Sequence, residues 1–295
     1  MGTKLSSKIK KGKEATLVTA FAYLFITTLV LLIVFPLMHV VSKAFSEEWA
    51  ISSGNVGIFP VGFQLEAMKS ILASNKFLVA FGNSILITVV GTICTLIVTA
   101  FTAFPLSLRN LPHMKKILLF FVFTMYFSGG IIPTYLLYNA YGILDTRTVL
   151  IVPGLINVFH LLIIKNFYED IPESIIESAK VDGATNLTIF ARFIVPLSKP
   201  VYATIVVFTS VMIWNNYFGP MMYVNSPKLQ TLPLYLRDMI SKATDIQAKM
   251  SMMQELSEES ITAAAIVAAT VPILCVYPFM QRYFVKGMTI GSTKG

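Results

Sequence analysis

Charged residues are scarce in this chain of 295 residues, where they make up 13% against 55% for hydrophobic residues. A water-soluble domain usually carries about 25% charged residues, so this composition excludes one. A disordered chain is excluded as well, because it would be poor in apolar residues. The only two cysteines, Cys94 and Cys275, lie in apolar runs, which excludes a secreted module held by disulfides. The net charge of +8 is therefore attributed to an integral membrane protein, with no nucleic-acid partner.

Several catalytic and binding motifs are also missing. The sequence has no H-E-x-x-H, and its two cysteines lack the spacing of a zinc site, so we expect no metal centre. It has no G-x-x-x-x-G-K-[ST] loop to hold the phosphates of ATP. Any ATP-driven work must come from a partner, and we expect no catalytic residue in this chain.

What the chain does have is long apolar runs. A bilayer core of roughly 30 Å needs about 20 mostly apolar residues per helix. Six runs are candidates, and none contains Asp, Glu, Lys or Arg. They cover residues 17–41, 78–104, 117–138, 149–164, 201–223 and 261–280. The fourth run is short and contains Pro153, which predicts a tilted or interrupted helix. We therefore predict an all-α polytopic membrane protein with six transmembrane helices, forming a single domain over residues 1–295.

Basic residues are unevenly divided between the two sides of this predicted membrane protein. The segments on one side carry 15 Lys and Arg residues, and those on the other side carry 8. The positive-inside rule then predicts that both termini are cytoplasmic. The external segments are 42–77, 139–148 and 224–260.

The apolar runs contain little that could bind and release a coupling ion. Ion-coupled transporters usually carry ionisable groups within the membrane. His160 is a titratable candidate there, but a lone histidine near the end of a span is more often a satisfied side chain. An ion-coupled secondary transporter of a small polar solute is the alternative reading. A membrane enzyme acting on lipid-linked sugar would need a cluster of carboxylates or histidines, and none is assembled.

One predicted cytoplasmic loop, residues 165–200, shows internal order. An Ile-Pro-Glu sequence near its start suits the first turn of a helix. Gly183 suits the end of that helix, because glycine adopts positive φ angles at little cost. Thr185 or Asn186 can cap a second helix, which Pro196 is expected to end. The loop is therefore predicted to be a helix–turn–helix module whose apolar residues need a partner surface.

This loop resembles the EAA loop of ABC importer permeases. The family pattern is E-A-A, three residues, G, nine residues and I-x-L-P. The positions that match it are Glu177, Ala179, Gly183 and Pro196. Three positions depart from it with residues of similar size or polarity, and these are Ser178, Phe193 and Val195.

The resemblance extends over nearly the whole chain. It is similar to carbohydrate-importer permeases of the polysaccharide and complex-oligosaccharide branch (LplC/YtcP-like), and to the second permease of alginate importers. The stretches that carry the similarity are 81–84, 130–135, 142–146, 214–217 and 283–287.

This family implies a type I importer with the MetI-like permease fold in the bacterial cell membrane, surrounded by lipid. The chain would pair with a second homologous permease. Two ATPase subunits would bind ATP and Mg, so this chain would need no cofactor. An extracellular sugar-binding protein or lipoprotein would deliver the sugar.

The resemblance also implies that the loop lies in a cleft of the ATPase and transmits its closure to the spans. The implied coupling residues are Glu177, Ser178, Ala179, Asp182, Gly183, Ala184, Phe190, Phe193 and Pro196. A loop that lies on lipid headgroups is the alternative, but it should have a basic polar face. Residues 165–199 carry four basic and five acidic side chains, which favours coupling.

The sugar pathway should be lined by amides and aromatic rings, which suit the hydroxyls and the C–H faces of sugars. An asparagine inside the membrane is costly unless it faces a partner or a cavity. The candidates are Tyr126, Tyr135, Asn139, Asn157, Trp214, Asn215, Asn216 and Tyr217. Hydrogen bonding between helices is the competing explanation for the asparagines, and an aromatic belt is the competing one for the rings near span ends.

Two further segments have open roles. The external segment 224–260 ends in a cluster of methionines, Met250, Met252 and Met253, which suits either binding-protein docking or packing over the external mouth. The C-terminal tail carries Arg282 and Lys286, which either reach the ATPase or anchor the chain at the cytoplasmic surface.

Overall fold

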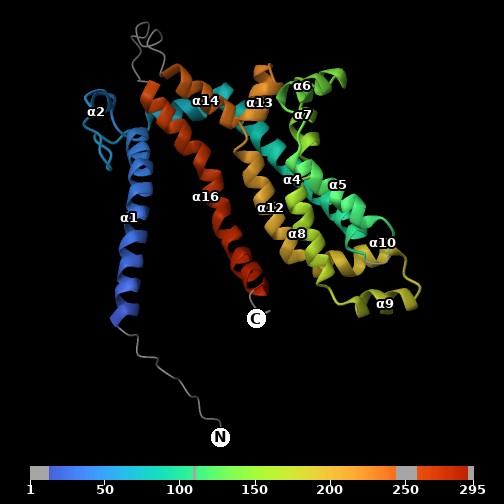
Figure 1. Ribbon diagram of the computed structural model, residues 1–295. Coiled ribbons are helices and arrows are strands. Elements are labelled where there is room, and N and C mark those ends of the chain that lie inside the picture. Colours follow the sequence, from blue (N-terminus) through green and yellow to red (C-terminus); the bar gives the residue numbers. More distant parts are fainter. Residues whose placement is uncertain (1–12, 109–110, 244–257, 292–295) are drawn as a thin grey trace. The chain divides into compact units, whose positions relative to one another are not determined.

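The computed structural model describes residues 13–108, 111–243 and 258–291, and this part of the chain is nearly all helical (Figure 1). A single β-bridge, between Ser46 and Phe63, is the one strand-like pairing in these ranges. The predicted all-α class is thus confirmed. The lysines before Lys13, the methionine cluster 250–253 and the last four residues lie outside the described residues, and so do the side chains beyond Cys275.

The chain divides into two compact units. The first combines residues 1–70 with Met253–Val267, and the second combines Ile71–Met252 with Ala268–Gly295. Each unit is described here by itself.

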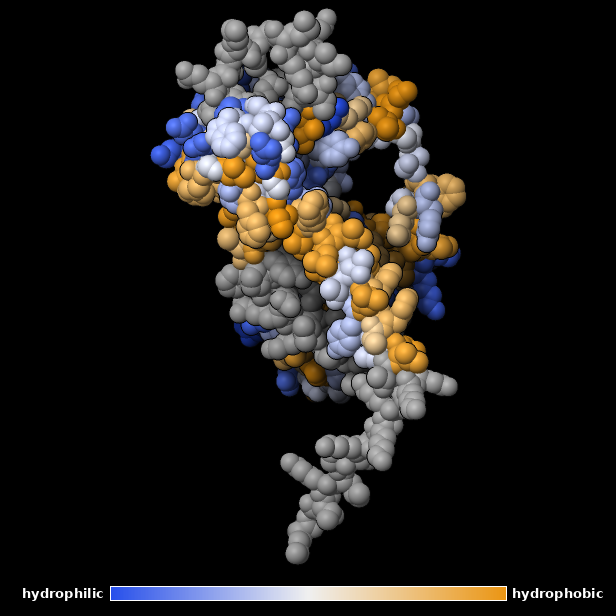
Figure 2. Space-filling model, turned by 90° about the vertical axis from the view of Figure 1, so that its left-hand side faces the viewer, coloured by the Kyte–Doolittle hydropathy of each residue, from blue (hydrophilic) through white to orange (hydrophobic). Residues whose placement is uncertain are grey.

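The first unit is built on α1 (Lys13–Ala44), a single helix that contains the first predicted span and is long and apolar enough to cross a membrane. Its large apolar side chains between Leu17 and Val41 are exposed. Figure 2 shows hydrophobic side chains along α1, below the more polar end of the unit that carries α2 (Glu48–Ser52). This exposed apolar length needs lipid or another apolar surface to cover it.

The segment that follows α1 is held by hydrogen bonds around one buried serine. The Ser46 hydroxyl donates to the Ser42 carbonyl at 2.7 Å and accepts from the Val61 amide at 3.0 Å. An ion pair between Lys43 and Glu259, 2.9 Å apart, lies in the same unit. Small buried residues let α1, the start of α3 (Glu66–Ala73) and the start of α16 (Glu258–Gly291) approach closely. These residues are Ala44, Ala67, Ala263 and Ala264.

The second unit is organised around α4 (Asn75–Ser107), a single helix that contains the second predicted span and is long and apolar enough to cross a membrane. This helix packs along α8 (Val158–Glu169) and α12 (Lys199–Trp214). The face of α4 inside the unit is lined by small and hydroxyl-bearing residues, and the buried ones include Ser84, Gly91, Thr92, Thr95 and Thr99. Such residues let helices pack closely and supply hydrogen bonds where little else is polar.

The third predicted span is not one helix. Residues 117–138 fall on α5 (Met114–Tyr126) and α6 (Ile131–Ala140), whose axes differ by 113°. Gly130, at the N-terminus of α6, has a φ of +85°, which glycine tolerates and other residues rarely adopt. The continuous helix predicted there is therefore wrong, because a run of apolar residues does not reveal a left-handed turn within it.

The fourth predicted span is interrupted, as Pro153 led us to expect. It consists of α7 (Thr148–Ile151), a 3-10 turn η1 (Val152–Gly154) and α8, with a bend of 44°. The Asn157 side chain caps α8 by accepting from the amide of His160 at 3.1 Å. The Thr95 hydroxyl of α4 donates to the Gly154 carbonyl at 3.2 Å. Side chains thus satisfy backbone groups that the break leaves free.

The fifth predicted span, 201–223, is also divided and not the continuous helix predicted. α12 ends at Trp214, and α13 (Phe218–Tyr223) follows after three residues. Two asparagines cap this break. The Asn215 amide donates to the Val211 carbonyl at 3.0 Å, and the Asn216 carbonyl oxygen accepts from the Gly219 amide at 3.0 Å. Two adjacent asparagines are good helix terminators because they bond the local backbone.

The sixth predicted span, 261–280, lies within α16. Within the described ranges, two helices are long and apolar enough to cross a membrane, and the total reaches five if each bent pair counts as one span. The predicted count of six is not established by this geometry alone.

Beyond α13 the chain forms η3 (Pro227–Leu229) and α14 (Leu232–Ala243), and side chains from elsewhere hold this stretch in place. The buried Asn83 amide donates to the carbonyls of Lys228 and Gln230 at 2.8 and 3.1 Å, and its oxygen accepts from Arg147 at 3.2 Å. A second contact comes from Asp145, whose carboxylate accepts from the backbone amides of residues 225 and 226.

The Asn83→Leu substitution tests this arrangement. Leucine fills a similar volume but leaves two carbonyls without their donor, and an unsatisfied buried group costs about 1–3 kcal/mol. We expect a lower midpoint of thermal unfolding in detergent. Asn55→Leu is the control, because Asn55 bonds only the exposed Ser53 hydroxyl through its side chain. Equal midpoints for the two variants would contradict the assignment.

Candidate functional site

The predicted helix–turn–helix module is present at one end of the second unit. It comprises α9 (Glu173–Val181), α10 (Asn186–Ile189), a π-helical turn η2 (Phe190–Ile194) and α11 (Val195–Leu197). Figure 1 places α9 and α10 beside the ends of α8 and α12. We call residues 173–197 the coupling module below.

The turn between its two helices depends on glycine, as predicted. Gly183 has a φ of +78°, and its amide donates to the Lys180 carbonyl at 3.0 Å. The next amide, that of Ala184, donates to the Ala179 carbonyl at 2.9 Å. These bonds satisfy the last carbonyls of α9 in the manner of a left-handed C-terminal cap.

Thr185 caps the second helix, which settles the choice between Thr185 and Asn186. Its hydroxyl accepts from the Thr188 amide at 3.3 Å. Pro196 does not end this helix, contrary to our expectation. The preceding π-helical turn leaves room for the proline ring, and the chain continues to Leu197 before bending by 77° into α12.

The inner face of the coupling module belongs to the core of the unit. Phe190 is buried against two rings of α4, with its centroid 4.7 Å from that of Phe101 and 5.2 Å from that of Phe104. The other core members from the module are Ala179, Ile189 and Ile194, and Ile176, Ala184 and Phe193 pack beside them. Phe190 thus joins the module to α4, and the expectation that its apolar residues need an external partner fails for this face.

The outer face remains open to a partner. Val181 is 88% exposed and Leu187 is 66% exposed, so two large apolar side chains flank the Gly183 turn without cover. Glu177, Ser178 and Asp182 are also exposed on this side. Exposed apolar groups rimmed by polar ones are typical of a protein-binding surface.

A hollow of about 630 Å³ lies beside α9. Among the described residues its wall holds four acidic side chains, Glu169, Asp170, Glu173 and Glu177, and one basic side chain, Lys180. Lys165 partly neutralises this wall through a 2.7 Å ion pair with Glu169. The net acidic character suits a basic side chain from a partner.

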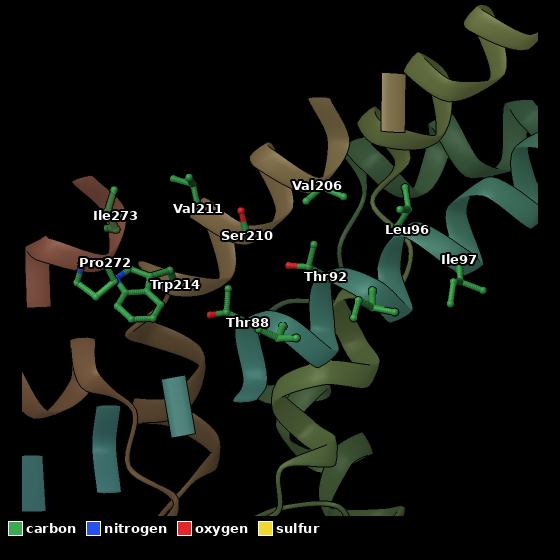
Figure 3. Close-up of a pocket in the computed structure, with 12 residues that line it drawn as sticks. Thr88, Thr92, Leu96, Ile97, Val206, Ser210, Val211, Trp214, Pro272 and Ile273 are labelled. Atoms are coloured by element: carbon green, nitrogen blue, oxygen red, sulfur yellow. The ribbon is translucent and has the colours of Figure 1, made fainter. Parts of the chain in front are cut away.

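An apolar groove of about 410 Å³ runs along the helical part of the second unit (Figure 3). It is lined by residues of α4, α12 and α16, among them Thr92, Ser210, Trp214 and Pro272. The Thr92 hydroxyl is buried and has no hydrogen-bond partner. Trp214 makes an edge-on contact with Phe81, with ring centroids 6.1 Å apart.

A second cavity of about 350 Å³ lies between α4, the α7–η1 segment, α12 and α13. Its wall contains two asparagine or tyrosine side chains, Asn216 and Tyr223, and three hydroxyl-bearing ones, Ser84, Thr88 and Thr231, of which Thr88 also lines the groove. We call it the polar cavity.

The structure disperses the predicted pathway residues. Trp214 lies in the groove and Asn216 in the polar cavity, whereas neither of these two sites is lined by the other six candidates. Tyr126 ends α5 and is exposed, and Asn139 lies exposed on α6. Tyr135 contacts Tyr223, with ring centroids 6.4 Å apart, and Tyr217 is exposed in the break after α12. Asn157 and Asn215 bond the local backbone at helix ends.

Sequence reasoning missed the hydroxyl face of α4. Thr88, Thr92, Thr95 and Thr99 are spaced by three or four residues, which is the spacing of one helix face and was the available signal. It also missed Asn83, Asp145 and Thr231, whose neighbours come from distant parts of the chain. Within the described ranges no group of three or more His, Cys, Asp or Glu residues could hold a metal ion.

Comparison with known proteins identifies the class. Residues 88–290 match the family described as the binding-protein-dependent transport system inner membrane component. The chain therefore belongs to this family: it is a membrane permease of a binding-protein-dependent transport system, and ATP hydrolysis is the task of a separate subunit.

Particular relatives agree with this assignment. The protein LplC of Bacillus subtilis (strain 168) is 41% identical over 264 residues, which cover 89% of this chain and 90% of LplC. The polygalacturonan/rhamnogalacturonan transport system permease protein YtcP of the same strain is 38% identical over 276 residues, which cover 92% of this chain and 96% of YtcP. A chain in the crystal structure of a bacterial ABC transporter for the acidic polysaccharide alginate matches with a TM-score of 0.86 and 28% identity, covering 92% of this chain and 98% of that one.

The Gly183→Ala substitution tests the turn of the coupling module. A Cβ at this position meets no atom within 4 Å, so the cost comes only from the positive φ and should be about 1 kcal/mol. We expect faster hydrogen exchange of α9 amides. Gly82→Ala is the matched control, because Gly82 also has open space but lies in a helix, where alanine is preferred. Unchanged exchange in the Gly183 variant would refute the requirement for glycine.

Proposed function

We propose that the chain is the permease subunit of an ATP-driven importer of carbohydrates, of the oligosaccharide or complex-glycan class. The observation that carries this is the coupling module, whose inner face is built into the core around α4 while its outer face is exposed at the Gly183 turn. The named substrates of YtcP and of the alginate transporter supply the class of cargo. An ion-coupled secondary transporter is set aside, because the family depends on a binding protein.

The proposed assembly contains this chain, a second homologous permease, two ATPase subunits that bind ATP and Mg, and an extracellular sugar-binding protein or lipoprotein. The exposed outer face of the coupling module would dock on one ATPase. Its contact residues would be Glu177, Ser178, Asp182 and Gly183, with Val181 and Leu187 as apolar contacts. Ala179, Ala184, Phe190, Phe193 and Pro196 would act from within by holding this surface rigid.

Rigidity is what coupling requires. A displacement at the ATPase is passed on only if the helix that receives it moves as one body with the spans. Phe190 lies in the same apolar cluster as residues of α4, α8 and α12. A push on α9 would therefore reach the α4 face that lines both the groove and the polar cavity.

The topology completes the proposal. α1, α4, the pair α5–α6, the pair α7–α8, α12 with α13, and α16 would make six crossings, with both termini and the coupling module in the cytoplasm. The distribution of basic residues supports this orientation.

Co-purification tests the coupling role. A tagged chain should bring down an ATPase subunit, and Glu177→Gln combined with Gly183→Asp should lose it, because the docking surface loses a charge and its turn. Glu66→Gln is the matched control, since Glu66 is also an exposed glutamate near the start of a helix, α3, but lies outside the coupling module and its hollow.

In the same strains, uptake of labelled oligosaccharide should fall by at least about tenfold with Gly183→Asp, which corresponds to about 1.4 kcal/mol of coupling. The amount of inserted protein should stay unchanged. Wild-type uptake by this variant would falsify the assignment of the loop.

Labelling of single cysteines tests the topology. In a chain with Cys94→Ser and Cys275→Ser, a membrane-impermeant maleimide should label Asn55→Cys in intact cells. Ser174→Cys should react only after the membrane is opened, because α9 is proposed to be cytoplasmic. Labelling of both positions in intact cells would contradict the proposal that α9 and residue 55 lie on opposite sides of the membrane.

A further inference from the structure

The polar cavity differs from the groove in how its wall is built. The side chains in its wall come from four separate segments of the second unit. The fourth segment contributes Thr231, which lies between η3 and α14. The apolar part of the wall includes Ile87, Val149 and Met212. Apolar walls with a few converging polar groups are the usual form of a small-molecule site.

Thr231 is the residue that singles this cavity out. It is only 4% exposed, and its hydroxyl has no hydrogen-bond partner. A buried hydroxyl without a partner is uncommon in native structures, because desolvation is not compensated. The Thr88 hydroxyl, also in this wall, is unpartnered as well.

The residues on either side of Thr231 are fixed by α4. The Gln230 carbonyl accepts from the Asn83 amide at 3.1 Å, and the Leu232 amide donates to the buried Ser84 hydroxyl at 2.8 Å. The two residues beside Thr231 are thus each held by a hydrogen bond to α4, whereas the Thr231 hydroxyl itself has no hydrogen-bond partner. A threonine also has few side-chain rotamers, so this hydroxyl is preorganised.

Among the residues that the structure describes, no Asp, Glu, Lys, Arg or His lines this cavity. A charged ligand would lose its hydration here without gaining a counter-charge, which is unfavourable. The hydroxyl and amide groups can instead bond alcohol groups, while the apolar surface suits C–H faces. A volume of about 350 Å³ lies at the low end for ligand pockets, which is the size of one ring and not of a chain.

We propose that the polar cavity binds a single uncharged sugar ring, with the Thr231 hydroxyl as its central hydrogen-bonding group. This inference rests on the proposed import of carbohydrates and adds a binding site to it. The permease itself would bind one neutral sugar unit of the cargo, at a site separate from the coupling module. Ser84 and Asn83 act as positioning residues, because they hold the segment that presents Thr231.

Protection of a cysteine from alkylation tests the proposal. The importer is purified through a tag on this chain, with its co-assembled subunits, in a Cys94→Ser, Cys275→Ser and Met212→Cys background. N-ethylmaleimide, which is neutral and small, then reports access to the cavity. The two probes are galactose and galacturonate, which differ only in a hydroxymethyl against a carboxylate group. Galactose should slow alkylation with a saturable concentration dependence, and galacturonate should not.

Thr231→Val keeps the shape of the side chain and removes its hydroxyl, so it should raise the galactose concentration for half protection by about tenfold. Thr92→Val is the matched control, because it removes another buried, unpartnered hydroxyl that faces the groove and not the cavity. It should leave protection unchanged. The unprotected alkylation rate of each variant checks that the cavity is intact.

Three results would overturn the subsite. These are no protection by galactose, equal protection by galacturonate, and equal protection in the Thr231→Val variant. If galactose gives no protection, the cavity holds only water, since about 350 Å³ has room for roughly ten water molecules. Deleting the gene separates this failure from that of the proposed function. If deletion abolishes uptake of a glycan, import stands and only the subsite falls, whereas undiminished uptake of every glycan tested removes both.

Discussion

The structure depends on one constraint, namely that broken helices inside a bilayer must have their free backbone groups satisfied by side chains. α4 meets this need from its hydroxyl face. Thr95 bonds the carbonyl that the η1 turn leaves free, and Thr99 lies 3.5 Å from the next one at Leu155. Asn157 and Asn216 do the same at their own helix ends. The interrupted segments, and the cavity between them, exist because one continuous helix carries these donors.

The same helix links the two functional regions. Its C-terminal part holds Phe101 and Phe104, on which Phe190 of the coupling module packs. Its opposite part holds Asn83 and Ser84, which fix the segment around Thr231. A rigid element that contacts both regions needs no hinge within it to communicate between them. α4 is therefore the element through which the proposed coupling would pass.

The sequence predicted well whatever depends on composition and short-range spacing. Apolar length identified α1 and α4, and local capping chemistry identified the turn at Gly183. The sequence-based prediction failed where an apolar run contains a helix break, as at Gly130 and Asn215. Hydropathy measures only how apolar a segment is and gives no information on the direction of the backbone. The sequence-based prediction listed Phe190 among the coupling residues but did not show that this side chain packs on α4, since spacing alone does not show which face of a helix meets α4. Thr231 was beyond reach because its neighbours lie about 150 residues away in the chain.

The exposed length of α1 has a consequence for how the protein is made. Its candidate span of 28 residues has no buried side chains in its most hydrophobic window, so this helix draws its stability from hydrocarbon and not from the rest of the chain. α1 precedes α4 in the chain and therefore emerges from the ribosome earlier. Its insertion into the membrane does not depend on packing against α4. The nascent protein is confined to two dimensions early, where its later helices and any partner subunit meet at a raised local concentration.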